Sequence, residues 1–302
     1  MVGKVMEKVV VLMSTYNGEK YLREQLESIF NQEGVEVTVI VRDDGSTDQT
    51  ISILKEYEKK ESLQFYTGEN LKPARSFMDL MYNASSAKYY ALCDQDDVWT
   101  QGKLKAAVEF LRTCNKPALY YHGMNLVDRE LNKYGYYFRE QEKAESLELS
   151  CFYGDEIAGC TMVFNDELMK KIREYKPTYI TMHDGWIHRV CLCVHGCIYG
   201  DKTAYINYRQ HGNNVVGMRQ RKISDQFSEL EKKECKFSRL AKEMIQGYKQ
   251  YLNPNERALL KNICGYQENV GSNLHLCIRC LTTNASLKLK LKCLIKIVCR
   301  AL

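Results

Sequence analysis

The stretch "KVVVLMSTYNGEKYLREQLESIFNQEGVEVTVIVRDDGSTD", residues 8–48, decides the fold. Residues 8–15 are apolar and rich in β-branched side chains, a composition typical of a strand. Apolar residues recur at helical spacing over 19–32. Over 35–48, apolar and polar residues alternate as in a strand, and the segment ends in a polar turn. Strand, helix, strand in this order predicts a parallel βαβ unit. We expect Asn17 to cap the helix.

The same alternation continues along the chain. A helix is predicted over 50–60, where Ser46 and Gln49 have the spacing of a capping box, and a strand follows at 63–70. Another helix and a strand, ending in "CDQDD", complete the pattern. Such a chain predicts a sheet flanked by helices, with ligands bound beyond the carboxyl ends of the strands.

The predicted organisation is α/β with a helical, basic C-terminal extension. Mixed strands and helices extend the first domain to 1–217, in two halves, 1–113 and 114–217, and residues 218–302 become helical. From Arg219 onward there are 17 Lys and Arg against 7 Asp and Glu, whereas the preceding residues hold 26 against 31. This charge asymmetry predicts two functional regions.

Composition indicates an intracellular protein. The chain has 302 residues and 13 cysteines, most of them in apolar runs, which favours reduced thiols packed as small hydrophobes. No N-terminal segment reads as a signal peptide, and no run reaches the roughly 18 apolar residues of a membrane span. We therefore expect the protein to stay in the cytoplasm.

The segment "ALCDQDDVWT", residues 91–100, gathers Asp94, Asp96 and Asp97 at a predicted strand end. Like charges this close repel one another unless a cation or a very polar ligand lies among them. The cluster therefore predicts a ligand site at the carboxyl edge of the sheet.

Four motifs together carry a resemblance to a known family. "MSTYNGEKYL" (13–22), "RDDGSTD" (42–48), "DQDDVW" (94–99) and "YRQHGNN" (208–214) resemble family 2 glycosyltransferases, which are inverting enzymes with the GT-A fold. The resemblance covers residues 8–217 and implies a nucleotide-diphosphate sugar donor. Within the family, the motifs look most like those of bacterial enzymes that transfer L-rhamnose in surface polysaccharide synthesis.

The resemblance implies how the donor is held, by the first half of the domain. Thr15 and Tyr16 would hold the nucleoside, and Asp44 would accept a hydrogen bond from the pyrimidine N3–H. Asp94 and Gln95 match the start of the family's D-x-D element, which contacts the ribose.

The resemblance also implies a divalent cation, Mg²⁺ or Mn²⁺, that bridges the donor phosphates. Asp96 or Asp97 would ligate it, and the motifs do not separate the two. His211 is a further candidate ligand, and Arg209 would face the departing diphosphate. Trp99 would wall the sugar site or pack beneath the metal loop.

"MHDGWIHRV" offers the base that inversion requires. Asp184 matches the family's catalytic carboxylate at the start of a helix, the alternative being an ordinary helix cap. His183 is expected to orient or pack beside the acceptor.

The C-terminal segment contains no acidic residue after Glu268. Basic residues recur every four positions in one stripe: Lys288, Lys292, Lys296 and Arg300. Apolar residues cover much of the remainder: Leu287, Leu291, Leu294, Ile295, Val298 and Leu302. An amphipathic basic helix predicts attachment to an anionic membrane surface, and the alternative is a solvated helix packed on the domain. Aromatic residues are sparse here, so no nucleic-acid partner is expected.

The predicted function is transfer of L-rhamnose from dTDP-L-rhamnose, with inversion, to a lipid-linked saccharide on the inner face of the cell membrane. A UDP-sugar donor (galactose, glucose or N-acetylglucosamine) is the alternative, because Lys72 and Pro73 stand where many relatives have glycine after "NL". A nucleotidyltransferase would need a basic Gly-rich loop that "STYNGEKYL" lacks. A non-catalytic nucleotide-binding or scaffold protein is disfavoured by the intact Asp184.

Overall fold

The computed structural model describes residues 6–139, 146–153, 157–210, 236–283 and 285–299. The strands are β1 (Glu7–Thr15), β2 (Val35–Asp43), β3 (Leu63–Thr67), β4 (Tyr89–Cys93), β5 (Val98–Trp99), β6 (Ala118–Val127), β7 (Lys133–Tyr137), β8 (Val163–Asn165) and β9 (Cys197–Arg209). The helices are α1 (Leu22–Phe30), α2 (Thr50–Lys60), α3 (Lys72–Asn83), α4 (Lys103–Leu111), α5 (Leu147–Tyr153), the 3₁₀ turn η1 (Gly159–Thr161), α6 (Asp166–Arg173), α7 (His183–Cys193), α9 (Lys236–Tyr248), α10 (Pro254–Gly265), α11 (Val270–Thr282) and α12 (Leu287–Val298).

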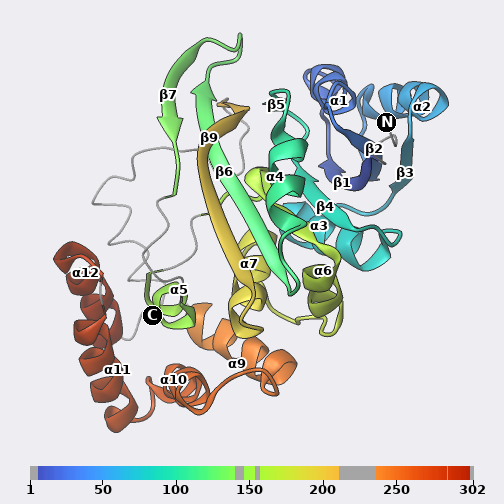
Figure 1. Ribbon diagram of the computed structural model, residues 1–302. Coiled ribbons are helices and arrows are strands. Elements are labelled where there is room, and N and C mark those ends of the chain that lie inside the picture. Colours follow the sequence, from blue (N-terminus) through green and yellow to red (C-terminus); the bar gives the residue numbers. More distant parts are fainter. Residues whose placement is uncertain (1–5, 140–145, 154–156, 211–235, 284, 300–302) are drawn as a thin grey trace.

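All the strands form one mixed sheet in the order β3-β2-β1-β4-β8-β6-β9-β5, with β7 paired to β6 (Figure 1). The first four are parallel, as the alternating pattern predicted, and β8 runs antiparallel to both β4 and β6. Because β1 lies between β2 and β4, the loops that follow these three strands meet at one edge. The predicted α/β fold with a mixed sheet is confirmed.

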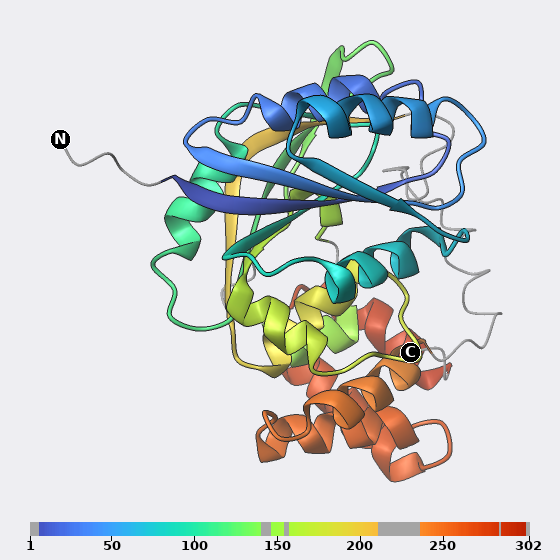
Figure 2. The same cartoon turned by 90° about the vertical axis from the view of Figure 1, so that its right-hand side faces the viewer.

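Each face of the sheet has its own core, because alternate residues of a strand point to opposite sides. Val9, Val11 and Met13 of β1 join the cluster under α1, α2 and α4. Val10 and Leu12 join the cluster that includes residues of α3, α6 and α7. Figure 2 shows α1 and α2 on one side of the strands and α3, α6 and α7 on the other.

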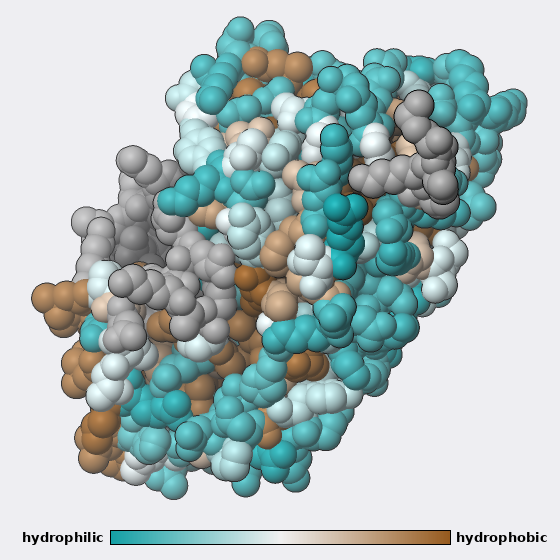
Figure 3. Space-filling view, viewed as in Figure 1, coloured by the Kyte–Doolittle hydropathy of each residue, from teal (hydrophilic) through white to brown (hydrophobic). Residues whose placement is uncertain are grey.

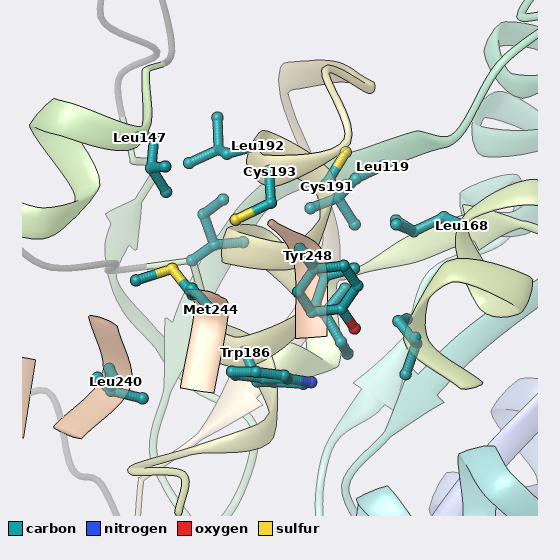
Figure 4. Packing of buried hydrophobic residues seen from close by; sticks show 14 of the residues in the cluster. Leu119, Leu147, Leu168, Trp186, Cys191, Leu192, Cys193, Leu240, Met244 and Tyr248 are labelled. Atoms are coloured by element: carbon teal, nitrogen blue, oxygen red, sulfur yellow. The ribbon is translucent and has the colours of Figure 1, made fainter. Parts of the chain in front are cut away.

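The C-terminal helices extend the second of these cores. Met244 and Tyr248 of α9 pack close to Trp186 of α7 (Figure 4), and the Trp186 and Tyr248 ring centroids are 6.0 Å apart. Four residues of α11 and α12 belong to the same cluster: Leu276, Cys280, Cys293 and Ile297. Within the described residues, no helix has the length and apolarity needed to cross a bilayer. The cysteines of these residues are all free thiols.

Two expected helix caps are wrong. The N-cap of α1 is Tyr21, without a side-chain cap, and Asn17 instead has φ 49° and accepts a hydrogen bond from Thr47 N at 2.9 Å. The N-cap of α2 is Gln49, again without a side-chain cap, and Ser46 Oγ accepts a hydrogen bond from Asn17 N at 2.8 Å. These polar side chains connect neighbouring loops, because the loops meet at the carboxyl edge of the sheet.

Candidate active site

Three loops interlock at the carboxyl edge. Thr15 ends β1 and its Oγ1 donates to Asp43 Oδ2, at the end of β2, at 2.9 Å. The Tyr16 N–H donates to Gln95 Oε1 at 2.8 Å, and Gln95 Nε2 donates back to the Tyr16 carbonyl at 3.1 Å. The Gln95 amide thus joins the loop after β4 to the loop after β1.

The two aspartates of "RDDGSTD" have different partners. Asp43 is fully buried and accepts from the backbone N–H of Gly45 at 3.0 Å, so it holds the turn. Asp44 is 2% exposed; one carboxylate oxygen pairs with the Arg42 guanidinium and the other accepts from Leu71 N at 2.9 Å. Asp44 therefore connects the turn to the start of α3.

Lys72, which follows Leu71, has a φ of 63°. A side chain in this left-handed region costs roughly 1–2 kcal/mol, and glycine avoids the cost. Lys72 is therefore a strained position beside Leu71, a partner of Asp44.

The acidic loop after β4 forms a cluster of potential metal ligands. One ligand atom each from Asp94, Asp97 and Cys160 lie within 4.8 Å of one another. Asp97 is fully buried; its Oδ1 accepts from Arg209 N at 2.9 Å, while its Oδ2 has no hydrogen-bond partner among the described residues. A buried carboxylate oxygen without a donor fits a cation ligand, and paired carboxylates suit Mg²⁺ or Mn²⁺ better than the thiol does.

Burial and like charges make this cluster reluctant to ionise. Burial first, and then the charges of Asp96 and Asp184, together raise the pKa of Asp94 to about 7. Burial, followed by the charges of Asp96 and Asp94, also raises the pKa of Asp97 well above its ordinary range. A bound cation would favour the charged form of both groups.

A buried lysine lies beneath the cluster. Lys103, in α4, is fully buried; its Nζ donates to the Cys160 carbonyl at 2.5 Å and lies 3.5 Å from the Trp99 ring centroid. Burial lowers the pKa of Lys103 to about 8. Trp99 is 3% exposed, which puts it under the loop. Sequence analysis missed Lys103, whose only signal is a cation four positions after Trp99, at the start of a helix.

Asp184 approaches the cluster from α7, about ninety positions further along the chain. It lies in the first turn of the helix, where the helix dipole favours a carboxylate, and it is half-buried. Its oxygens accept from Gly185 N at 2.6 Å and from Gly159 N at 3.3 Å. His183 is buried instead and stacks on Phe77, with ring centroids 4.1 Å apart. Burial lowers the pKa of His183.

Arg209 lies behind the acidic loop. It is 2% exposed, and its guanidinium donates to the Asp96 carbonyl at 2.9 Å and to the Glu24 carboxylate at 2.5 Å. It also lies 4.4 Å from the Tyr21 ring centroid. These contacts hold the loop that carries Asp96. His211 lies outside the described residues.

The edge therefore combines a cluster of potential metal ligands, a neighbouring half-buried carboxylate and loops rich in hydrogen-bonding groups. The family model described as "Glycosyl transferase family 2" matches residues 10–168, which is more than half of the chain. The chain belongs to glycosyl transferase family 2. The predicted family membership is confirmed, and with it the prediction that the protein is a glycosyltransferase.

Relatives and solved structures agree with this assignment. The glycosyltransferase is 29% identical over 230 residues to the dTDP-rhamnosyl transferase RfbG of Shigella flexneri, a match covering 68% of this chain and 73% of the relative. It is 31% identical over 109 residues to the putative teichuronic acid biosynthesis glycosyltransferase TuaG of Bacillus subtilis, covering 35% of this chain and 43% of TuaG.

Two solved structures show the fold. The S. aureus TarS 1-349 structure in complex with UDP-GlcNAc has a TM-score of 0.60 at 18% identity, covering 98% of this glycosyltransferase and 82% of that chain. The mannosyltransferase PcManGT from Pyrobaculum calidifontis, in complex with GDP-Man and Mn2+, has a TM-score of 0.52 at 14% identity, covering 99% and 87%. The GT-A fold predicted from the motifs is thereby confirmed.

Proposed function

We propose that this glycosyltransferase transfers L-rhamnose from dTDP-L-rhamnose, with inversion, to a lipid-linked saccharide acceptor in surface polysaccharide synthesis. The similarity to a dTDP-rhamnosyl transferase over 68% of the chain supports the sugar and the nucleotide. The solved neighbours with UDP-GlcNAc and GDP-Man support a nucleotide-sugar donor in general.

The observation that carries the mechanism is the approach of Asp184 to the acidic cluster: Asp184 accepts a hydrogen bond from Gly159 N at 3.3 Å, next to Cys160, which lies in the cluster with Asp94. In an inverting transfer, the acceptor hydroxyl loses its proton as its oxygen bonds to the anomeric carbon, while the bond from that carbon to the diphosphate oxygen breaks. Asp184 would take the proton, since its carboxylate is half-buried beside the donor site.

The acidic loop would hold the donor diphosphate through a divalent cation, Mg²⁺ or Mn²⁺. Asp97, with its unpartnered buried Oδ2, fits as a ligand, and Asp94 and Asp96 lie beside it. When bound, such a cation neutralises charge on the diphosphate as it leaves. Asp97 is favoured over Asp96 because the orphaned oxygen belongs to Asp97. His211 stays a candidate ligand.

Thr15, Tyr16 and Gln95 would shape the nucleoside side of the site, since the Gln95 amide fixes the exposed Tyr16 loop against the loop after β4. Asp44 would accept a hydrogen bond from the pyrimidine N3–H, because each of its carboxylate oxygens has two lone pairs and Arg42 and Leu71 N occupy one on each. Arg209, held by Glu24, would support the diphosphate side through the loop it braces.

The acceptor side would lie near Asp184, with His183 packed beneath it against Phe77. Trp99 would support the site from below, with Lys103 beside its ring. In this arrangement residues 1–113 hold the donor and residues 114–217 approach the acceptor. The lipid-linked acceptor would bring the enzyme to the inner face of the cell membrane, with the C-terminal helices as its point of attachment.

A panel of nucleotide-sugars tests the donor. Purified full-length enzyme is incubated with Mn²⁺ and with dTDP-L-rhamnose or UDP-galactose, UDP-glucose or UDP-N-acetylglucosamine, and donor hydrolysis and thermal shift are measured. Hydrolysis and stabilisation that are strongest with dTDP-L-rhamnose support the proposal. If the enzyme prefers a UDP-sugar, the proposed donor is wrong and the alternative donor takes its place, while the proposed mechanism is unchanged.

A further inference from the structure

In the part of the chain that the structure describes, most of the exposed large hydrophobic side chains lie on α11 and α12. Of the fourteen large apolar side chains exposed among the described residues, eight lie on α11 and α12, and each is at least 52% exposed. We call them the α11–α12 face: Val270, Leu274, Ile278, Leu281, Leu287, Leu291, Ile295 and Val298. Singly scattered surface hydrophobes need no explanation, but a contiguous set of this size marks an interaction surface.

The two helices form an antiparallel hairpin, so their stripes lie side by side. Asn273 Nδ2 donates to the Ile297 carbonyl at 3.0 Å, and at the other end Lys290 Nζ donates to the Leu281 carbonyl at 2.9 Å. On each helix the exposed positions recur at spacings of four, four and three, which align them along one side. Figure 3 shows brown, hydrophobic residues along the edge where Figure 1 places these helices.

The opposite side of the hairpin is already committed to the domain. Leu276 and Cys280 of α11 and Cys293 and Ile297 of α12 are buried in the core cluster. Arg279 also pairs with Glu148 of α5 at 2.6 Å. The helices are thus apolar on two sides, and the domain covers only one of them.

The charge of the sequence that forms α11 and α12 indicates what covers the other side of the hairpin. After Glu268 the sequence has no acidic residue, and besides Arg279, which pairs with Glu148, five basic residues follow: Lys288, Lys290, Lys292, Lys296 and Arg300. Positions 288, 292 and 296 each follow an exposed apolar position by one residue, about 100° around the helix. If a second copy of the chain docked on this face, the basic residues of the two hairpins would be brought together and would repel one another, because neither hairpin has an acidic residue to pair with them.

We propose that the α11–α12 face docks on an anionic lipid bilayer, with its eight aliphatic side chains entering the headgroup boundary and the hairpin lying in the membrane plane. Helices of 13 and 12 residues are shorter than the roughly 20 residues of a span, so they would lie on the bilayer rather than cross it. Docking through this face would bring the enzyme to a lipid-linked acceptor. That purpose rests on the proposed function, whereas the docking itself does not.

This mode of attachment differs from one carried by the basic stripe of α12 alone. Lys296 is half-buried, with its Nζ 5.8 Å from the Phe237 ring centroid. Arg300 and Leu302 lie outside the described residues, as do the side chains of Lys288 and Lys292. Attachment through apolar side chains persists in part at high salt, because burial of apolar surface is not screened as exposed charges are.

Vesicle sedimentation of the full chain tests the proposal. The probes are vesicles of pure phosphatidylcholine and vesicles with about one-third phosphatidylglycerol, at low and at half-molar salt. The Leu274→Gln/Leu291→Gln variant removes one aliphatic side chain from each helix, and glutamine keeps a similar helix propensity. The control is Met6→Gln/Tyr134→Gln, which removes two exposed apolar side chains from elsewhere.

We expect the wild type and the control to sediment with the anionic vesicles and to keep part of this binding at high salt. The partition coefficient of the leucine variant should fall roughly tenfold or more. Equal sedimentation of the leucine variant and wild type overturns the proposal, as does a wild-type dimer that the leucine variant dissociates. Circular dichroism checks that the variant is folded; if it is not, the same comparison is made with Ile278→Gln/Ile295→Gln.

Donor hydrolysis measured without vesicles separates this inference from the proposed function. The leucine variant should hydrolyse the donor like the wild type, because its substitutions lie on the exposed surface of the C-terminal helices. If the wild type binds vesicles but hydrolyses no nucleotide-sugar, the proposed function fails and the docking face stands. If it hydrolyses the donor but binds no vesicle, the docking face fails alone.

Discussion

The charge of the Asp184 carboxylate raises the pKa of Asp94, although the two residues belong to elements far apart in the chain. Asp94 directly follows β4, and Asp184 lies in the first turn of α7. A site that places a half-buried carboxylate beside a cluster of acids can combine a cation with a general base.

Replacing Asp184 by asparagine should lower the transfer rate by roughly 10²–10⁴-fold, the range expected for loss of a general base. Donor affinity, measured by thermal shift, should be nearly unchanged. Asp166→Asn is the matched control, because Asp166 lies in the first turn of α6 and shares the helix-terminus role. A collapse of donor affinity in Asp184→Asn would mean that Asp184 is structural.

Activity should depend on a divalent cation and be lost in excess chelator. Asp97→Asn should abolish the thermal stabilisation given by Mn²⁺, since it alters the carboxylate whose buried Oδ2 has no donor among the described residues. Asp96→Asn should reduce turnover and keep more of the Mn²⁺ response. Glu109→Gln changes an exposed carboxyl of α4 and serves as the control. Full activity of metal-stripped enzyme would refute the cation site.

The stability of the metal-free enzyme should carry a pH dependence from Asp94. Its pKa is raised from 3.8 to about 7, so the folded state binds the proton more tightly than the unfolded chain does. The contribution is therefore fully present below about pH 4 and is lost as the pH rises through about 7. Urea unfolding of wild type and Asp94→Asn in chelator, at about pH 5 and pH 8, measures it.

Asparagine does not titrate, so relative to the wild type Asp94→Asn should be more stable at the higher pH than at the lower. Mn²⁺ favours the ionised carboxylate and should stabilise the wild type more at the higher pH. An equal difference between the two proteins at both pH values would show that Asp94 is not perturbed in the folded enzyme.

Lys72→Gly should raise the free energy of unfolding by up to about 1 kcal/mol, because glycine adopts the positive φ without strain. Part of this gain is offset because glycine also increases the conformational entropy of the unfolded chain. Lys72→Ala keeps a Cβ atom and should give no such gain. Thermal unfolding of the three proteins makes the comparison. If alanine stabilises as much as glycine, the strain at φ 63° is not the cause.

The sequence by itself determined the elements and their order. The switch from strand to helical periodicity over residues 8–48 is local information, and β1, α1 and β2 appear where it predicts them. It also placed Asp44, Asp94 and their neighbours at strand ends, since the parallel sheet follows from the same alternation. Cap positions were wrong because Asn17 and Ser46 form hydrogen bonds across loops, and those bonds depend on which loops meet.

Only the tertiary structure decided which distant groups share a site. Lys103 and Cys160 join the acidic cluster because α4 and η1 fold beneath the loop after β4, and no spacing along the chain encodes that approach. The same holds for the α11–α12 face, since the sequence of α12 alone shows a basic stripe. Pairing with α11 aligns two apolar rows and buries the opposite side of both helices, because a helix can bury only the side that finds a neighbour.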